Sequence, residues 1–594
     1  MALVATPPVL PDKTTSHQSW QEFFAGLTNQ QWFCLICLTC YCAWLFFYGL
    51  TKGELYRTES LRAIIAAEFL RSGNWIVPML YGEPLFTKPP GMYAAIALAS
   101  LPWGGVSEWT ARLPSAIAAT LTVFLFYWYF GRLMGRRAGL IAALILPMSF
   151  MCLDKSTAAE IDMLQAFWVS ASILFFLRGL EVVEVRGSKV EDGGSSKEDR
   201  AVTSTSSKIE ILQKWFSFRA RISNPPAIAN DLSGAKRKPS MLDAPSSILH
   251  PPSSLWFWWL AALLCVAGGV LTKWTGAAFF YGTVIPLLYW RWRMRLLWGR
   301  HHLACAGIAA GICLAWVAAA VAMTGWQEFY GTVSREALMR LSPSHHHRPY
   351  PWGESSIHPL RLLAAGLPCS AFALLTLCPG FSVLWDIRTR RLLQAFHCWS
   401  WSNMLFWTVI PEHATRHSFP LFPGLAGLAA LVWIAWFRDF RIPKLQFANF
   451  RPRWISSAST KTNKSQFRVA GLFIGLVVVW LVVRLVYVEA VLPRRNPTRQ
   501  PKEKGDQLAA LVPPSEVLYL FQLKDEGIMF YYGRTVRRLP GPAQLPSSKQ
   551  PLYCILDESE WRHWSSIRPA EMLLRMPDEQ GDPIVLVRVK PVGS

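Results

Sequence analysis

Charged residues are scarce in this chain: Asp, Glu, Lys and Arg together make up 16% of its 594 residues. Soluble globular proteins carry about 25%. The composition therefore argues against an ordinary soluble protein. The 52% share of hydrophobic residues, with 29 Trp and 34 Phe, indicates a membrane protein instead.

Acidic residues are the scarcer charged class, and the formal net charge is consequently +22. Such a charge can indicate a nucleic-acid-binding protein. Here, however, the basic residues fall in short clusters between apolar runs, which is typical of cytoplasmic loops that face anionic lipids. We therefore expect membrane lipids as partners, and no nucleic acid.

Two further features are missing. Residues 1–30 lack the basic start, short apolar core and cleavage site of a signal peptide, so we expect the first apolar run to be retained as a membrane anchor. The distribution of Lys and Arg places residues 1–30 in the cytoplasm. Nearly all of the 12 cysteines lie inside apolar runs, Cys554 being the exception. Small cysteines pack well in membrane helices, and the sequence therefore predicts no disulfide framework.

Long apolar runs are abundant. A membrane-spanning helix needs about 20 mostly apolar residues. This criterion predicts about eleven spans, near residues 31–50, 112–130, 138–153, 162–179, 255–272, 275–290, 303–324, 360–385, 392–410, 419–437 and 468–488. The apolar stretch 89–103 is broken by prolines, and we predict a re-entrant or interfacial helix there.

The positions of Lys and Arg orient these spans. Four basic loops fall on one side of the membrane, and short basic loops mark the cytoplasm. That side also receives residues 184–253, a Ser-, Lys- and Glu-rich insert predicted to be largely disordered. The opposite, extracytoplasmic side receives the segments 51–111, 154–161, 273–274, 325–359 and 411–418 and the C-terminal tail.

These patterns predict a mainly α, polytopic protein of the inner or plasma membrane. Residues 31–488 form its transmembrane domain, with 51–111 as the first outer loop. Residues 489–594 form a small extracytoplasmic α/β domain. Short apolar runs in that domain predict strands and one helix, namely strands at 517–522, 528–532, 552–556 and 584–589 and a helix at 558–565.

Unusual polar residues gather in the outer segments. The first outer loop carries Glu54, Tyr56, Thr58 and Glu59 ahead of a helix-like stretch that ends near Gly73. Apolar residues on one face of this stretch predict a helix along the membrane surface. Thr58 suits the N-cap of this helix. Glu59 either complements the helix dipole or takes part in chemistry.

The same loop holds Lys88, which two prolines follow. An ammonium group there suits an anionic head group such as a phosphate, and the alternative is a lysine that snorkels to the interface. Glu160 and Asp162 stand at the entrance to the fourth predicted span. Acids at a membrane boundary are often merely solvated, but the apolar span continues directly after Asp162, and carboxylates in such places are functional candidates.

Two further outer segments are basic. One contains His345, His346, His347 and Arg348, and the other contains Arg416 and His417. Adjacent histidines cannot all bind one metal ion from a regular element, so contacts with an anionic substrate are favoured over a metal site. Acids and bases from separate segments thus converge on one membrane face. This arrangement suits proton transfer on a charged lipid head group.

The order of these motifs resembles the aminoarabinose (ArnT-type) transferases and protein O-mannosyltransferases, which are polytopic transferases with the GT-C fold. The resemblance covers roughly residues 30 to 435, and the C-terminal domain matches only in general layout. It rests on seven motifs, at 58–78, 82–90, 109–115, 159–163, 271–273, 346–349 and 416–420.

The resemblance implies that a sugar is transferred, with inversion, from a polyprenyl phosphate donor, undecaprenyl-linked if the source is bacterial, to a lipid, glycan or protein. A carboxylate of the first outer loop would deprotonate the acceptor, and basic residues would stabilise the departing lipid phosphate. Lys88 matches the family's phosphate-contacting lysine, and Asp162 matches its second outer-loop acid. The candidate substrate-binding residues are Tyr56, Lys88, Glu160, His346, His347, Arg348, Arg416 and His417.

Two positions depart from this family. It usually has Asp-Glu where this chain has Thr58-Glu59, and a threonine cannot serve as a base at neutral pH. Glu59 is the favoured catalytic residue in its place, with Glu54 close by and Asp162 as the third candidate. Thr87 stands where aminoarabinose transferases carry a glutamate near a bound metal, so we expect no divalent metal there. No cofactor is predicted from the sequence.

Two other functions stay open. A transferase that has lost its activity would serve as a scaffold, an alternative raised by Thr58. A transporter or lipid-handling protein is the second alternative. Transporters usually show paired half-repeats with broken helices near the bilayer midplane, and this sequence shows no such repeat, which favours the transferase.

Overall fold

The computed structural model describes residues 29–193, 255–341, 350–411, 414–438, 462–495, 499–564 and 568–591. The chain divides into two units. One comprises residues 29–178 and 256–594, and the other comprises residues 1–28 and 179–255. In the second unit the description is limited to the end of one helix and the first residue of another. The packing and the candidate site belong to the first unit.

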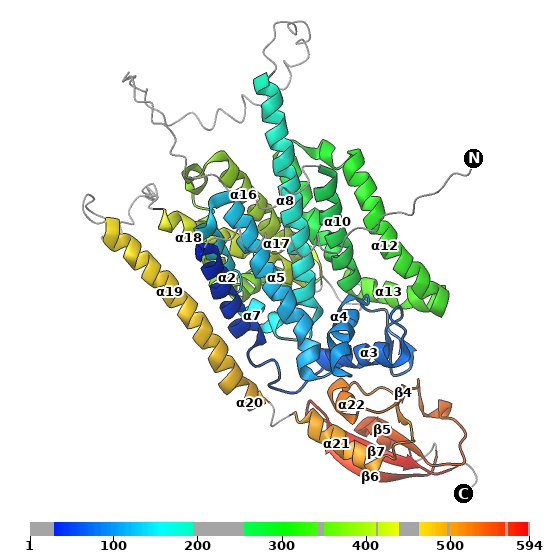
Figure 1. The fold of residues 1–594 in the computed structure, drawn as a ribbon. Coiled ribbons are helices and arrows are strands. Elements are labelled where there is room, and N and C mark those ends of the chain that lie inside the picture. Colours follow the sequence, from blue (N-terminus) through cyan, green and yellow to red (C-terminus); the bar gives the residue numbers. More distant parts are fainter. Residues whose placement is uncertain are drawn as a thin grey trace, which may run out of the picture. The chain divides into compact units, whose positions relative to one another are not determined.

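Helices form most of the described chain (Figure 1). Up to residue 193 they are α2 (Asn29–Cys42), α3 (Thr58–Ser72), α4 (Gly91–Ser100), α5 (Glu108–Met134), α6 (Arg136–Ile145), α7 (Phe150–Ser156) and α8 (Ile161–Gly193). From residue 255 they are α10 (Leu255–Thr272), α11 (Gly276–Trp290), α12 (Arg300–Thr324), α13 (Trp326–Leu341), α14 (Trp352–Ala365), α15 (Cys369–Leu375), α16 (Ile387–His397), α17 (Asn403–Val409), α18 (Phe422–Phe437), α19 (Thr462–Val486) and α20 (Leu492–Arg495).

The C-terminal region adds three helices, α21 (Pro501–Leu511), α22 (Glu526–Tyr532) and α23 (Glu558–Arg562). The strands are β1 (Met79–Leu80), β2 (Glu83–Pro84), β3 (Leu518–Leu520), β4 (Val536–Arg538), β5 (Leu552–Asp557), β6 (Ala570–Pro577) and β7 (Pro583–Val589). The prediction of a mainly α chain with a small C-terminal α/β region is confirmed.

Six of the described helices are long and apolar enough to cross a membrane: α5, α8, α10, α12, α18 with the turn before it, and α19. The other five predicted spans are shorter or interrupted. Residues 31–50 and 275–290 form shorter apolar helices. Pro147 separates α6 from α7, and Pro368 separates α14 from α15, because proline has no N–H to donate within a helix. A π-helical segment, Cys398–Ser402, interrupts the span at 392–410.

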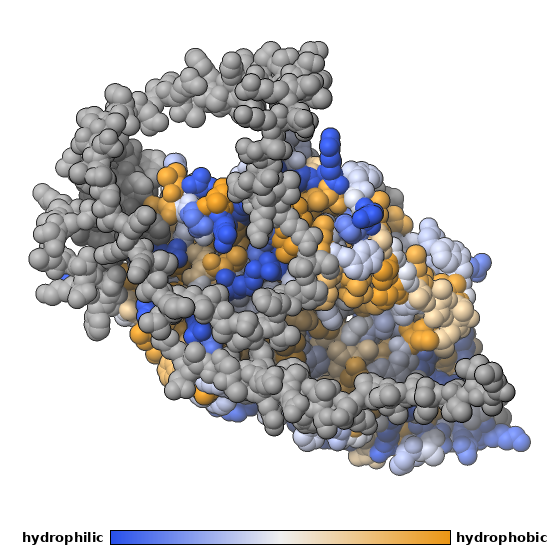
Figure 2. Space-filling view, turned by 45° about the horizontal axis from the view of Figure 1, so that its top comes forward, coloured by the Kyte–Doolittle hydropathy of each residue, from blue (hydrophilic) through white to orange (hydrophobic). Residues whose placement is uncertain are grey.

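The apolar helices differ in how much protein covers them. The most apolar stretch of α18 is completely buried, whereas 17% of the corresponding stretch is buried in α12 and in α19. Gly427 of α18 lies so close to Phe396 that a Cβ at this glycine would stand 2.3 Å from the ring. Hydrophobic side chains such as Leu314 and Val482 are exposed, and hydrophobic surface is extensive in Figure 2. Surface of this kind is stable against lipid tails.

The C-terminal region forms a five-stranded sheet in the order β4-β3-β5-β7-β6. β3 pairs in parallel with β4 and β5, and β7 pairs antiparallel with β5 and β6. Three of the predicted strands are present as β3, β5 and β7, and the predicted helix begins at Glu558 as α23.

The predicted strand at 528–532 is wrong, because these residues lie in α22. Ile528, Met529 and Tyr532 are buried together at helical spacing, and a five-residue apolar run does not by itself distinguish a strand from a helix. Strands β4 and β6 were not predicted. β4 has three residues, two of them arginines, and Met576 is the one buried residue of β6.

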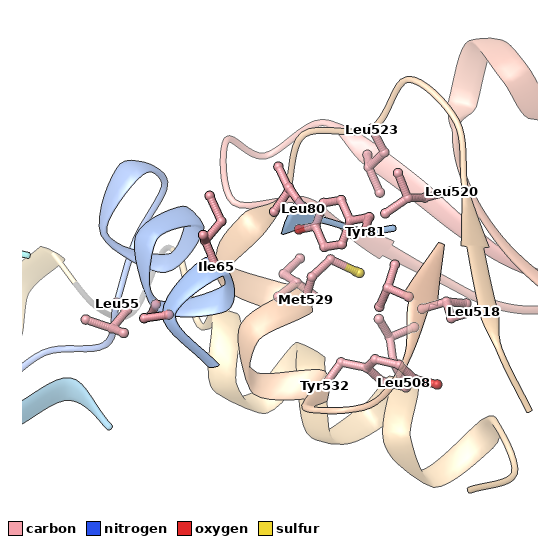
Figure 3. Packing of buried hydrophobic residues seen from close by; sticks show 14 of the residues in the cluster. Leu55, Ile65, Leu80, Tyr81, Leu508, Leu518, Leu520, Leu523, Met529 and Tyr532 are labelled. Atoms are coloured by element: carbon pink, nitrogen blue, oxygen red, sulfur yellow. The ribbon is translucent and has the colours of Figure 1, made fainter. Parts of the chain in front are cut away.

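A continuous hydrophobic core joins the C-terminal sheet region to the 51–111 segment (Figure 3). Its labelled members come from both parts of the chain: Leu55, Ile65, Leu80, Tyr81, Leu508, Leu518, Leu520, Leu523, Met529 and Tyr532. The backbone N–H of Arg538 donates to the Tyr81 carbonyl at 3.0 Å, and the Tyr531 hydroxyl accepts from the N–H of Leu55 at 2.9 Å. Each large apolar side chain buried there contributes about 1.5–3 kcal/mol, so the two parts stabilise each other.

Acidic side chains lie at this junction. Glu579 accepts a hydrogen bond from the N–H of Arg57 at 3.4 Å and another from the N–H of Ile528 at 3.2 Å. Burial, together with the Asp578 and Glu579 carboxylates, raises the pKa of the nearby Asp525 to about 7, although a hydrogen bond from the N–H of Glu579 opposes the shift. The folded protein therefore favours the protonated form of Asp525.

We expect the protein to be less stable at pH 8 than at pH 5.5, and Asp525→Asn to weaken this dependence. An unfolded Asp has a pKa of about 3.9. As the pH rises from about 4 to about 7, Asp525 ionises in the unfolded chain but not in the folded protein, so the free energy of unfolding falls by up to about 4 kcal/mol. About 2 kcal/mol of this loss falls above pH 5.5. Melting temperatures in detergent at both pH values measure the effect. The exposed Asp506 supplies the control Asp506→Asn, and an unchanged pH dependence in Asp525→Asn would contradict the prediction.

Candidate active site

Helix α3 begins at Thr58, the position at which the sequence departs from the family it resembles. Arg57 directly precedes the helix with a φ of 47°, and no side chain caps the helix N-terminus. The predicted N-cap role of Thr58 is therefore wrong, because Thr58 is already helical. Its hydroxyl instead lies 3.4 Å from Oε1 of Glu160, in the 154–161 segment.

Glu59, the favoured catalytic residue, forms an ion pair with Arg112 of α5. Its Oε1 and Oε2 accept hydrogen bonds from Nε and Nη2 of Arg112, both at 3.0 Å, and Oε1 also accepts from the N–H of Ala159 at 2.7 Å. Burial by itself raises the pKa of Glu59, but Arg112 and this N–H outweigh burial and hold the pKa below its ordinary value. Glu59 thus ties α3 to α5 and to the 154–161 segment, as expected of a positioning residue.

Arg112 also organises the start of the 51–111 segment. Arg112 is 6% exposed. Besides Glu59 it contacts four backbone carbonyl oxygens, those of Leu50, Lys52, Gly53 and Glu54, at 2.9–3.2 Å. The planar fork of an Arg side chain presents five N–H donors, and a Lys could not replace it in this arrangement.

The 154–161 segment and the start of α8 supply three carboxylates and one lysine. Lys155 forms ion pairs with Asp154 at 2.9 Å and with Glu160 at 2.8 Å. Asp162 pairs with Lys273, which follows α10, at 2.7 Å. Both partners of the second pair are almost completely buried, with side chains 4% and 3% exposed. Buried charges of this kind are tolerated only when they are paired.

Arg62 joins these groups, although sequence reasoning did not select it. Its Nη1 donates to the Thr58 carbonyl at 2.7 Å and to the Ala159 carbonyl at 3.1 Å. It also lies close enough to Glu59 and Asp162 to stabilise their charges. The one available signal was the presence of an Arg one helical turn after Thr58, on the buried face of α3.

Lys88 pairs with Glu336 of α13, and its Nζ also donates to the Thr87 carbonyl at 2.9 Å. Three residues later, Gly91 approaches the end of α10 so closely that a Cβ would stand 2.7 Å from the Leu271 carbonyl oxygen. This contact sets the Lys88 turn beside the helix end that leads to Lys273. Glu336 was not predicted, because its segment carries no recognisable motif.

Glu54 and Tyr56, two predicted site residues of the first outer loop, lie against the start of the C-terminal region. Glu54 accepts a hydrogen bond from the N–H of Lys502 at 3.4 Å, and burial raises its pKa. The guanidinium of Arg499 lies 3.8 Å from the ring centre of Tyr56. These two side chains therefore contact the start of the C-terminal region.

The basic segments are described only in part. His346, His347 and Arg348 lie outside the described residues, so their place in the site stays a prediction. Arg416 is exposed and His417 is buried in the turn that leads into α18. Within the ranges that the structure describes, no three His, Cys, Asp or Glu side chains are arranged as ligands of a metal ion.

Comparison with known proteins identifies relatives for part of the sequence. The family model of dolichyl-phosphate-mannose-protein mannosyltransferases matches residues 87–187. An undecaprenyl phosphate-alpha-4-amino-4-deoxy-L-arabinose arabinosyl transferase from Edwardsiella ictaluri is 31% identical over 130 residues, which are 22% of this chain and 23% of the relative. A second such transferase, from Sodalis glossinidius, is 30% identical over 146 residues, 24% of this chain and 26% of the relative. The chain thus aligns with about a quarter of the length of these relatives.

The fold itself matches a solved structure over nearly its whole length. ArnT from Cupriavidus metallidurans, bound to undecaprenyl phosphate, has a TM-score of 0.60 and 15% identity, and the match covers 94% of this chain and 98% of that one. At this identity the likeness establishes the fold. The resemblance predicted from the motifs is confirmed, and the chain is an integral membrane protein.

Proposed function

We propose that this protein transfers a sugar, with inversion, from a polyprenyl-phosphate-linked donor to an acceptor at the extracytoplasmic membrane face. One observation carries the proposal. Glu160 and Asp162 form ion pairs with Lys155 and Lys273, and Arg62 donates to the same segment. The Lys88 turn packs through Gly91 against the end of α10 that leads to Lys273, within the fold of a protein solved with undecaprenyl phosphate. The relatives named as undecaprenyl phosphate-dependent transferases support the donor class.

Lys88 is the proposed contact for the donor phosphate. An ammonium group placed where negative charge develops on the departing phosphate lowers the barrier, because a buried site screens charge less than water does. The donor phosphate would compete with Glu336 for Lys88. Arg348, Arg416, His346 and His347 are proposed to contact the same anion from the basic segments.

The acceptor is a lipid, a glycan or a protein. The relatives do not narrow this choice, since the matching family model describes transfer to protein and the matching transferases are named for their arabinosyl donor. The distribution of Lys and Arg supports a cytoplasmic N-terminus and an extracytoplasmic C-terminal domain, so we place the reaction outside the cytoplasm, in an inner or plasma membrane.

A transfer assay tests the proposal. The purified protein, reconstituted in liposomes with membrane lipid extract as the source of acceptor, is given undecaprenyl phosphate sugars with a labelled sugar. We expect labelled product and released undecaprenyl phosphate in equal amounts. A protein that binds undecaprenyl phosphate but consumes none of a panel of donors would contradict the proposal and favour a scaffold. Single-cysteine labelling at positions 88 and 348 tests the topology, since labelling from opposite sides would exclude one common site.

A further inference from the structure

Three carboxylates of the candidate site, those of Glu59, Glu160 and Asp162, differ in how their oxygen atoms are used. Glu59 has both oxygens on Arg112 and a third hydrogen bond from Ala159. Asp162 is buried against Lys273 with its side chain 4% exposed, and Lys155 and Arg62 lie nearby. Neither side chain can turn towards an incoming substrate unless a buried ion pair breaks, which is costly.

Glu160 is different. Its Oε2 pairs with Lys155 at 2.8 Å, while its Oε1 contacts the Thr58 hydroxyl at 3.4 Å. Ordinary O–H···O hydrogen bonds measure about 2.5–3.0 Å, so the Thr58 contact is weak. In the described part of the chain Oε1 has no other partner. The side chain is 13% exposed, and one oxygen therefore remains able to accept a proton.

The surroundings of Glu160 also suit a base. Lys155 contacts both Asp154 and Glu160, so the carboxylate is held in place by one oxygen while the other is presented. Thr58 is uncharged and close to Oε1. A carboxylate at position 58 would face Glu160 directly, and two like charges at such a distance disfavour each other's ionisation. In this protein the carboxylate is that of Glu160, in the 154–161 segment, and the group facing it is the uncharged hydroxyl of Thr58, at the start of α3.

We propose that Glu160 is the catalytic base of the transfer reaction; this assignment rests on the proposed function. Oε1 of Glu160 accepts the proton of an acceptor hydroxyl group. The acceptor oxygen forms a bond with the anomeric carbon of the donor sugar as the bond from that carbon to the phosphate oxygen breaks. The electron pair of the broken bond leaves with the polyprenyl phosphate, and Glu160 afterwards releases the proton to water.

The first test replaces Glu160 by Gln, which has the same size and leaves Asp154 as a partner for Lys155. We expect kcat to fall by about 10²–10⁴-fold, the usual effect of losing a general base, while KM for the donor changes less than about threefold. Asp154→Asn, which alters the other, exposed partner of Lys155, is the matched control and should retain the activity of the wild type. Melting temperatures of both variants report on folding.

The second test removes the carboxylate at position 160 and introduces one at position 58, on the other side of the Thr58–Glu160 contact. Thr58→Asp in the Glu160→Gln background places a carboxylate about where Oε1 now lies, and we expect kcat to recover by at least about tenfold over Glu160→Gln alone. Full activity in Glu160→Gln, with the wild type active, would overturn the assignment and leave the proposed function intact. A folded Glu160→Gln without activity that Thr58→Asp does not restore would also overturn it. An inactive wild type would overturn the proposed function and this assignment with it.

Discussion

Replacing Lys88 with Ala is expected to lower kcat/KM for sugar transfer by about 10³-fold or more. Loss of one preorganised donor to a developing negative charge typically costs 10²–10³-fold, and Lys88 contributes a full positive charge from a side chain that is 17% exposed. Both the binding of the donor and the departure of the phosphate depend on it. The effect is measured as initial rates over a range of donor concentrations in liposomes.

Two variants make this result specific. Lys52 lies in the same segment and also pairs with a glutamate, Glu489, but that pair is exposed, with side chains 44% and 43% exposed. Lys52→Ala should therefore keep its activity within about twofold. Lys88→Arg, which retains the charge, should recover part of the lost rate. A Lys88→Ala protein with nearly normal kcat/KM would exclude this lysine from the phosphate site.

Replacing Arg112 with Met is expected to destabilise the protein by about 3–5 kcal/mol. The change leaves the buried Glu59 carboxylate without its cation and four backbone carbonyls without their donor. The expected consequences are a much lower yield of folded protein and a melting temperature lower by several degrees. Sugar transfer should be lost in parallel, because Glu59 and Arg112 hold α3 against the 154–161 segment.

A double variant separates the lost ion pair from lost packing. Glu59→Met combined with Arg112→Met removes both charges, and it should be more stable than Arg112→Met alone because no charge remains buried without a partner. Arg71→Ala removes an exposed pair with Glu68 on the same helix and should cost at most about 1 kcal/mol. If Arg112→Met has the melting temperature of the wild type, the contacts of Arg112 do not stabilise the start of the 51–111 segment.

Many features of the fold followed from composition and periodicity. Apolar runs of sufficient length identified the helices that can cross a membrane, and α5, α8 and α10 lie where they were expected. Interrupted helices such as α6 and α7 were read as single spans, because hydropathy averages over a proline that ends a helix. In the C-terminal region α22 was mistaken for a strand, since its short apolar run fits both periodicities.

The sequence by itself determined that this is a many-span membrane protein with polar and charged side chains in the segments between its helices, because burial of apolar runs in lipid is a local property of the chain. It also identified Lys88, Glu160 and Asp162 as candidates. Only the tertiary structure decided their partners. That Glu59 is engaged by Arg112, Asp162 by Lys273 and Lys88 by Glu336 depends on contacts between residues 53, 111 and 248 positions apart. Such contacts arise from packing of distant helices, which no local pattern encodes, and they leave one oxygen of Glu160 able to accept a proton beside Thr58.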